Sequence, residues 1–147
     1  AETNAVIGGE SSGGLAVRGH IAGKDGIYAA ALLVEMLAVT GKSVSQLYRE
    51  ITDKYGMLYY EDAAFTMTQA RKVELQEKLF VKLEVPDFGN AVEKINRIDG
   101  CKVYFTDGSW VICRFSGTEP LLRMAAEADE QAEAERCIRV WRTFLGL

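Results

Sequence analysis

Hydrophobic positions follow two different patterns along the N-terminal third of the chain. Short apolar runs at 5–7 and 15–17 lie on either side of a glycine-rich segment, 8–14. Runs of this length next to clustered glycines are typical of short strands joined by a loop. Between 27 and 39, only Glu35 is charged. A helix that is apolar on nearly every side is normally buried, so we predict a buried helix over 27–39.

Capping residues mark the ends of this helix and the start of the next. Asp25 stands where an N-cap belongs, and Gly41 where a C-cap belongs. Ser43, followed three residues later by Gln46, is a capping-box pattern. Apolar residues then recur at helical spacing until Gly56, which predicts a second, amphipathic helix and a domain boundary near that glycine.

The middle of the chain predicts one extended segment and one helix. Residues 57–68 are rich in aromatic side chains and threonine, so we expect an extended segment with a break at 61–62. Thr68 caps a third predicted helix, which ends before Pro86. The apolar face of this helix is expected to hold Val73, Leu79, Phe80 and Leu83.

The C-terminal third carries the clearest strand pattern. Two β-rich runs, 102–106 and 109–115, are separated by Asp107 and Gly108, the strongest hairpin signal that a short sequence offers. Alternation over 121–128 predicts a third strand.

A final helix follows, with Asp129 as its expected cap and a stripe of Ala134, Ile138, Trp141 and Leu145. The order of strands and helices predicts an α+β fold: a C-terminal antiparallel sheet with helices packed on one face. A partial α/β domain of strand, loop, strand and two helices precedes it. The predicted domains are 1–56 and 57–147.

Composition restricts the kind of protein further. With 48% hydrophobic and 26% charged residues, the 147-residue chain has enough apolar surface for a folded core. A net charge of −4 gives no general attraction for nucleic acid or an anionic membrane, so we expect neither as a partner. Cys101, Cys113 and Cys137 lack metal-binding spacing, which predicts no metal site and reduced core thiols in a cytoplasmic protein.

The segment 114–123, Arg-Phe-Ser-Gly-Thr-Glu-Pro-Leu-Leu-Arg, holds the most informative polar residues. A dianion needs many converging donors, and the backbone near Gly117 with the hydroxyls of Ser116 and Thr118 can supply them. The forked guanidinium of Arg114 adds charge-assisted donors. These residues favour a phosphate-binding loop. From the residues alone, the alternative is an ordinary turn with two solvated arginines.

The glycine-rich loop presents Glu10 and Ser12. A carboxylate accepts hydrogen bonds from vicinal hydroxyls and a serine both donates and accepts, a combination suited to sugars. A surface loop without a ligand is the alternative. His20 and Lys24 precede the first helix and can act as proton carriers or phosphate contacts, or simply as residues that lead into a helix.

Together these segments resemble the α-D-phosphohexomutases, specifically the bacterial phosphoglucomutase/phosphomannomutase type. Their order and separation fit the end of that family's third domain followed by its whole fourth domain. The resemblance is carried by Gly8-Gly9-Glu10-Ser11-Ser12-Gly13-Gly14, by Arg18-Gly19-His20-Ile21 with Lys24-Asp25-Gly26, and by Arg114-Phe115-Ser116-Gly117-Thr118-Glu119-Pro120 with Arg123.

In that family a phosphoserine donates its phosphoryl group to a hexose phosphate, and a hexose bisphosphate intermediate turns over to interconvert 1- and 6-phosphosugars. The resemblance implies that Glu10 and Ser12 bind sugar hydroxyls. It implies that Lys24, together with His20, lines the active site near the reacting hydroxyl. It also implies a binding site for the phosphate that is not transferred, formed by Arg114, Ser116, Gly117, Thr118 and Arg123.

The chain departs from the family pattern in two respects: it has neither the Thr-Ala-Ser-His-Asn-Pro stretch with the catalytic serine nor the Asp-Gly-Asp loop that binds magnesium. We therefore expect a fragment that is inactive alone, without a cofactor of its own. The full-length enzyme is expected to use Mg²⁺, with the remaining N-terminal domains as partners.

A truncated third domain would leave an apolar patch exposed, through which a dimer is expected. The main alternative is a stand-alone phosphosugar- or phosphate-binding module without mutase activity, and a further one is an oligomerisation domain that binds no ligand. The choice among glucose, mannose and amino-sugar phosphates stays open, with Glu10, Ser11 and Ser12 weakly favouring the phosphoglucomutase/phosphomannomutase type.

Overall fold

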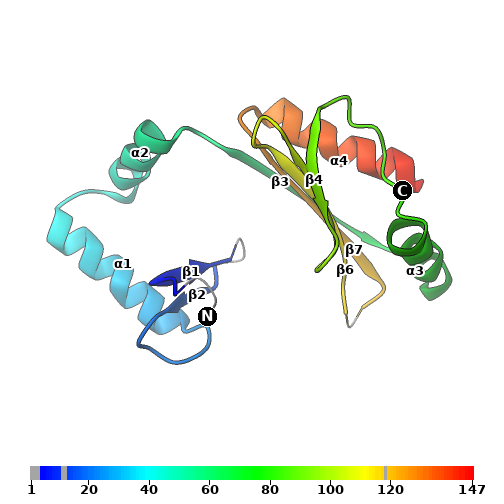
Figure 1. The fold of residues 1–147 in the computed structure, drawn as a ribbon. Helices are drawn as coiled ribbons and strands as arrows, with labels where there is room; N and C mark the ends of the chain where they lie inside the picture. Colours follow the sequence, from blue (N-terminus) through cyan, green and yellow to red (C-terminus); the bar gives the residue numbers. More distant parts are fainter. Residues whose placement is uncertain (1–3, 11–12, 118) are drawn as a thin grey trace. The chain divides into compact units, whose positions relative to one another are not determined.

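The computed structural model describes residues 4–10, 13–117 and 119–147. Two predicted ligand-binding residues, Ser12 and Thr118, lie outside the described residues. The chain forms two compact units, Ala1–Tyr55 and Gly56–Leu147, and each is described by itself (Figure 1).

The first unit is a short hairpin followed by two helices. Strands β1 (Ile7–Gly9) and β2 (Leu15–Val17) pair in antiparallel fashion. Helix α1 spans Gly26–Thr40 and helix α2 spans Val44–Tyr55. The predicted order of strand, loop, strand and two helices is confirmed.

The predicted caps of this unit are also present. The carboxylate of Asp25 accepts hydrogen bonds of 3.0 Å from two backbone N–H groups in the first turn of α1. Gly41 ends α1 in the left-handed conformation, with φ of 66°. At the start of α2 the Ser43 N–H donates to Gln46 Oε1 at 2.8 Å, and the Gln46 N–H donates to Ser43 Oγ at 3.3 Å. Local signals in the sequence therefore set these helix ends.

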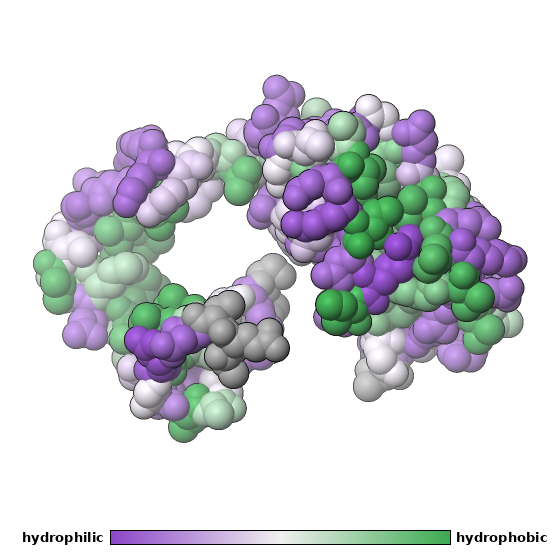
Figure 2. All heavy atoms as spheres, viewed as in Figure 1, coloured by the Kyte–Doolittle hydropathy of each residue, from purple (hydrophilic) through white to green (hydrophobic). Residues whose placement is uncertain are grey.

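Helix α1 is apolar but is not buried, so the prediction of a buried helix is wrong, whereas the exposed apolar patch that was also predicted is present on this helix. No residue of α1 is buried, and Ile27, Val34 and Val39 are 86%, 65% and 80% exposed. Hydrophobic side chains are visible on the surface of the first unit (Figure 2). The two-stranded sheet is all the sheet that the described part of this unit contains, which leaves most of the helix uncovered. No single helix among the described residues is long and apolar enough to cross a membrane. Helices α1 and α2 reach that length and composition only when they are taken together, and they are bent by 84° at their break.

The second unit is a five-stranded antiparallel sheet in the order β3-β7-β6-β5-β4, and its helices are packed on one face, which confirms the predicted fold class (Figure 1). Helix α4 packs against β3, β6 and β7. The elements are β3 (Tyr59–Thr66), α3 (Gln69–Gln76), the π-helical turn η1 (Glu77–Val81), β4 (Val92–Asn96), β5 (Cys101–Phe105), β6 (Trp110–Phe115), β7 (Leu121–Ala128) and α4 (Gln131–Leu145).

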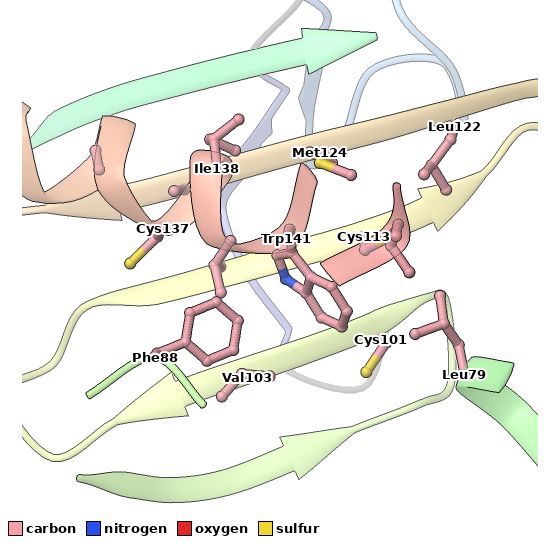
Figure 3. Close-up of a cluster of buried hydrophobic side chains, with 14 of the residues drawn as sticks. Leu79, Phe88, Cys101, Val103, Cys113, Leu122, Met124, Cys137, Ile138 and Trp141 are labelled. Atoms are coloured by element: carbon pink, nitrogen blue, oxygen red, sulfur yellow. The ribbon is translucent and has the colours of Figure 1, made fainter. Parts of the chain in front are cut away.

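The core of the second unit lies between α4 and the sheet (Figure 3). Trp141 is fully buried and its ring packs edge-on against Phe88 at 5.7 Å between centroids. All three cysteines are buried and unpaired, as predicted, and burial raises the pKa of the Cys137 thiol to about 11. Alternate residues of β5, β6 and β7 point into this core, and the residues between them face the open side of the sheet.

Several expectations for the second unit are corrected. Strand β3 runs through Glu61 and Asp62 without a break. Every second residue of the strand is partly covered while its neighbours are exposed, which is the alternation of one continuous strand.

Of the apolar face predicted for the third helix, Leu79 is buried and Phe80 packs against the core, as predicted. Val73 is instead 54% exposed, and Leu75, which was not predicted, is buried. Leu83 lies beyond the helix.

The final helix begins at Gln131, with Glu130 rather than Asp129 in the cap position and no side-chain capping bond. Strand β4 was not predicted, because its sequence, Val-Glu-Lys-Ile-Asn, has the weak alternation of an exposed edge strand.

Candidate functional site

We call the loop between β6 and β7, residues 116–120, the phosphate loop, after the role that the sequence predicts for it. It is closed by its own hydrogen bonds. The Ser116 N–H donates to the Leu121 carbonyl at 2.8 Å, and the Leu121 N–H donates to the Glu119 carbonyl at 2.8 Å. The Ser116 hydroxyl accepts from the Glu119 N–H at 3.3 Å. One predicted donor, Ser116, is therefore held at the mouth of a tight turn.

Arg114 and Arg123 are directly opposite each other on neighbouring antiparallel strands. Both are exposed, and both alternate with buried residues, so they share the open face of the sheet. Like charges in a direct cross-strand pair destabilise a sheet. Such a pair beside a turn is well suited to an anion, because an anion between two guanidiniums removes their repulsion.

The two arginines differ in their partners. Arg114 Nη1 lies 2.9 Å from Asp99 Oδ2, with 49% and 77% of the two side chains exposed. The guanidinium of Arg123 makes no hydrogen bond or ion pair with a residue in the described part of the chain. Asp99 was not predicted as part of the site, since it lies 15 residues before Arg114 in the sequence.

Gly117 leaves open space above the phosphate loop. A Cβ atom placed on it would meet nothing within 4 Å, and its φ is outside the left-handed range. Its N–H makes no hydrogen bond to any described residue. The chain itself does not require glycine here, so the open space at this position is consistent with the close approach of a ligand.

Lys72 of α3 also reaches the phosphate loop, and sequence reasoning missed it. Its Nζ donates to the Ser116 carbonyl at 2.7 Å and to the Glu119 carbonyl at 3.4 Å. No sequence pattern indicates this contact, because Lys72 lies 44 residues before Ser116. The structure therefore adds a lysine that contacts the backbone of the loop.

In the first unit the structure brings two predicted residues together. Lys24 Nζ lies 2.5 Å from Glu10 Oε2, and both side chains are about half exposed, at 58% and 52%. Gly14 allows this contact: a Cβ there would lie 2.6 Å from Lys24 Cδ and 3.3 Å from Glu10 Oε2. The carboxylate and the ammonium thus form one exposed donor and acceptor pair beside the glycine-rich loop.

His20 is held by a different partner. Its Nε2 lies 2.9 Å from Asp25 Oδ2, and its ring stacks on Tyr28 at 4.0 Å between centroids. The backbone hydrogen bond from Tyr28, followed by the hydrogen bond from His20, holds the pKa of the Asp25 carboxyl below its usual range. An imidazole oriented by a carboxylate is suited to proton transfer through its other nitrogen.

No three His, Cys, Asp or Glu side chains come together among the described residues as a bound metal ion would require. The described residues therefore do not fit a magnesium site. The candidate polar groups are the loop donors and the two opposed arginines of the second unit, and the Glu10–Lys24 and His20–Asp25 pairs of the first unit.

Comparisons with known proteins match both units. Residues 1–55 match the family model described as phosphoglucomutase/phosphomannomutase, alpha/beta/alpha domain III. Residues 66–140 match the phosphoglucomutase/phosphomannomutase C-terminal domain. The two matches together cover most of the chain.

Curated relatives and solved structures agree with these matches. A phosphoglucomutase/phosphomannomutase of Thermococcus kodakarensis is 34% identical over 139 residues, covering 95% of this chain and 28% of its own length. A probable phosphoglucosamine mutase of Methanosarcina acetivorans is 38% identical and covers 88% of this chain and 27% of its own. A Burkholderia thailandensis phosphoglucomutase/phosphomannomutase family structure superposes with a TM-score of 0.68 at 26% identity, covering 98% of this chain and 28% of its own. The chain thus spans about 28% of the relatives' length.

Proposed function

This chain belongs to the phosphoglucomutase/phosphomannomutase family of α-D-phosphohexomutases, and we propose that it binds the sugar hydroxyls and the non-transferred phosphate of a hexose phosphate. It would do so during the reversible interconversion of 1- and 6-phosphosugars, with the remaining domains of the enzyme supplying the phosphoryl group. The observation that carries the proposal is the direct cross-strand pairing of Arg114 and Arg123 beside the phosphate loop.

In this proposal the phosphate lies between the arginine pair and the phosphate loop. Arg114, Arg123 and the Gly117 N–H act as donors, together with the hydroxyls of Ser116 and Thr118. A dianion takes charge-assisted hydrogen bonds from guanidinium and N–H groups more strongly than neutral acceptors do. Asp99 has to give up its exposed ion pair with Arg114, and such a pair contributes only about 0–1 kcal/mol.

The first unit would bind the sugar ring and transfer a proton. Glu10 would accept hydrogen bonds from sugar hydroxyls, with Ser12 beside it, and Lys24 would bridge Glu10 and the substrate. His20, held by Asp25, would exchange a proton with the reacting hydroxyl. One fixed phosphate site and one hydroxyl-binding loop can accept a hexose bisphosphate in either orientation, because the phosphate at either end presents the same charge.

A binding experiment on this chain tests the proposal. We would titrate it with glucose 1-phosphate and follow amide resonances by NMR, beside plain glucose and the Arg114→Ala variant. We expect shifts at Ser116 and Gly117 that saturate with glucose 1-phosphate and are absent with glucose and in the variant. Equal shifts with plain glucose, or none in a folded wild-type chain, would contradict a phosphate site here.

A further inference from the structure

Three carbonyl groups of the phosphate loop accept hydrogen bonds from Lys72 or from Met67. The Ser116 and Glu119 carbonyls accept from Lys72 Nζ at 2.7 and 3.4 Å. The Pro120 carbonyl accepts from the Met67 N–H at 3.0 Å. These donors belong to α3 or to the residue just before its cap, so these three carbonyls are held on the side of α3 and its cap.

The orientation of one peptide unit follows from this. The Ser116 carbonyl and the Gly117 N–H belong to the same peptide bond, and the described chain has no cis peptide bonds. In a planar trans peptide the carbonyl and the N–H point in opposite directions. Lys72 therefore turns the Gly117 N–H away from α3, where it makes no hydrogen bond to a described residue.

Anion binding depends on this direction. A phosphate is attracted by an N–H and repelled by a carbonyl oxygen, so a peptide that flips would replace a donor with a repulsive acceptor. Glycine has the backbone freedom to allow such a flip, since no Cβ restricts it. A lysine bond to the adjoining carbonyl would hold the favourable orientation.

We infer that Lys72 is the positioning residue of the phosphate loop: it fixes the Ser116–Gly117 peptide with its N–H toward the bound phosphate, without touching the phosphate itself. The inference rests on the proposed function of that loop. Lys72 is half-buried and lies one turn into α3, whose first turn is capped by Thr68. Its ammonium also places a positive charge beside the loop backbone.

The same helical segment offers a matched control. Lys78 donates to the Phe144 carbonyl at 3.0 Å and lies 3.7 Å from the centre of the Phe144 ring. It too is half-buried and ties the segment to a backbone carbonyl, but on α4 rather than on the loop. A lysine that only joins elements would behave alike at both positions.

We would measure the affinities of Lys72→Met, Lys72→Arg, Lys72→Gln, Lys78→Met and Arg114→Ala for inorganic phosphate and glucose 1-phosphate. The Gly117 amide resonance without ligand would be recorded for each. We expect Lys72→Met to weaken binding about tenfold, as for one lost hydrogen bond to a charged group. It should also shift the free Gly117 resonance. Lys72→Arg should keep most of the affinity and leave the free Gly117 resonance near its wild-type position. Lys78→Met should change neither the affinity nor that resonance. If Lys72→Met does not fold, Lys72→Gln replaces it, with the same expected loss.

The outcomes separate the two hypotheses. Unchanged affinity in Lys72→Met or its substitute, with loss in Arg114→Ala, overturns the positioning role and leaves the proposed function standing. Equal loss in Lys72→Met and Lys78→Met, with the Gly117 resonance unmoved, overturns it too, because the effect is then general. Unchanged affinity in Arg114→Ala overturns the proposed phosphate site, and the role of Lys72 with it.

Discussion

Helices α1 and α4 each have 15 residues, but they differ in how they are packed. Helix α4 is amphipathic and buries five residues against the sheet: Ala134, Cys137, Ile138, Trp141 and Leu145. Helix α1 is more apolar and buries none. Burial therefore depends on what a helix packs against as well as on its own composition: α4 lies on the five-stranded sheet of its own unit, whereas the unit of α1 has only a two-stranded sheet among its described residues.

The largest expected effect comes from the core under α4. Trp141→Ala removes a fully buried indole and should lower the free energy of unfolding by about 3–5 kcal/mol. Val34→Ala in α1, where the side chain is 65% exposed, should change it by about 0.5 kcal/mol or less. Urea unfolding followed by circular dichroism measures both. A core-sized loss in Val34→Ala would mean that α1 is covered in solution, for example by a second copy of the chain.

A second prediction concerns the close approach of phosphate to the backbone at Gly117. Gly117→Ala should leave stability nearly unchanged, because its Cβ meets nothing within 4 Å, but should weaken phosphate binding about tenfold by loss of close backbone approach. Gly100→Ala is the contrasting control. Its φ is +110° and its Cβ would lie 2.8 Å from the Cys113 carbonyl oxygen, so it should lower thermal stability. Undiminished phosphate affinity in Gly117→Ala would place the anion elsewhere.

The acid response of the second unit gives a third prediction. Hydrogen bonds from Arg136 and Asn90, with the charge of Arg136, lower the pKa of the Glu133 carboxyl from 4.5 to about 2. A lowered pKa in the folded state stabilises the fold above pH 4.5, and this contribution is lost as the pH falls toward 2. Glu133→Gln should therefore lower the melting temperature at pH 7 and make little difference near pH 2.

Glu135 provides the control for this measurement. It lies two residues further along α4 and pairs with Arg139 at 3.4 Å, with the arginine 62% exposed. Glu135→Gln should change the melting temperature little at either pH, since exposed pairs contribute about 0–1 kcal/mol. Parallel melting curves for wild type and Glu133→Gln across the pH range would contradict the assigned role of Arg136.

The smallest expected effect is on phosphate affinity, when the carboxylate that competes for Arg114 loses its charge. Asp99→Asn frees Arg114 from its exposed ion pair and should raise phosphate affinity by up to about fivefold. Asp129→Asn, an exposed change at the far end of β7, serves as the control. Isothermal titration with inorganic phosphate measures both. Equal affinity gains in the two variants would show an effect of net charge rather than release of Arg114.

Much of the fold follows from short stretches of sequence. The capping pairs around α1 and α2 are confirmed, and so is the hairpin at Asp107 and Gly108, where Gly108 has φ of 91°. The strands flanking that hairpin alternate strongly enough to be predicted. Strand β4 was missed, because it is a short edge strand with mostly exposed residues and a bulge in its pairing.

The candidate site, too, contains residues that the sequence predicts and residues that only the structure reveals. The motif residues from Arg114 to Arg123 stand out in the sequence, because their donors are crowded into ten positions. Asp99 and Lys72 do not, because each reaches the site from another element. Likewise, the contact of Lys24 with Glu10 depends on a chain path that spans 14 residues.

The sequence by itself determined the caps of α1, α2 and α3, the hairpin, the alternating strands and the donor-rich loop, because each depends on hydrogen bonds or side-chain spacing among near neighbours. Tertiary structure alone decided that Arg114 lies opposite Arg123, that Lys72 holds the Ser116 carbonyl, and that α4 is buried while α1 is exposed. These outcomes depend on strand register and on which surfaces meet, and such long-range pairings are set by the energy of the whole fold.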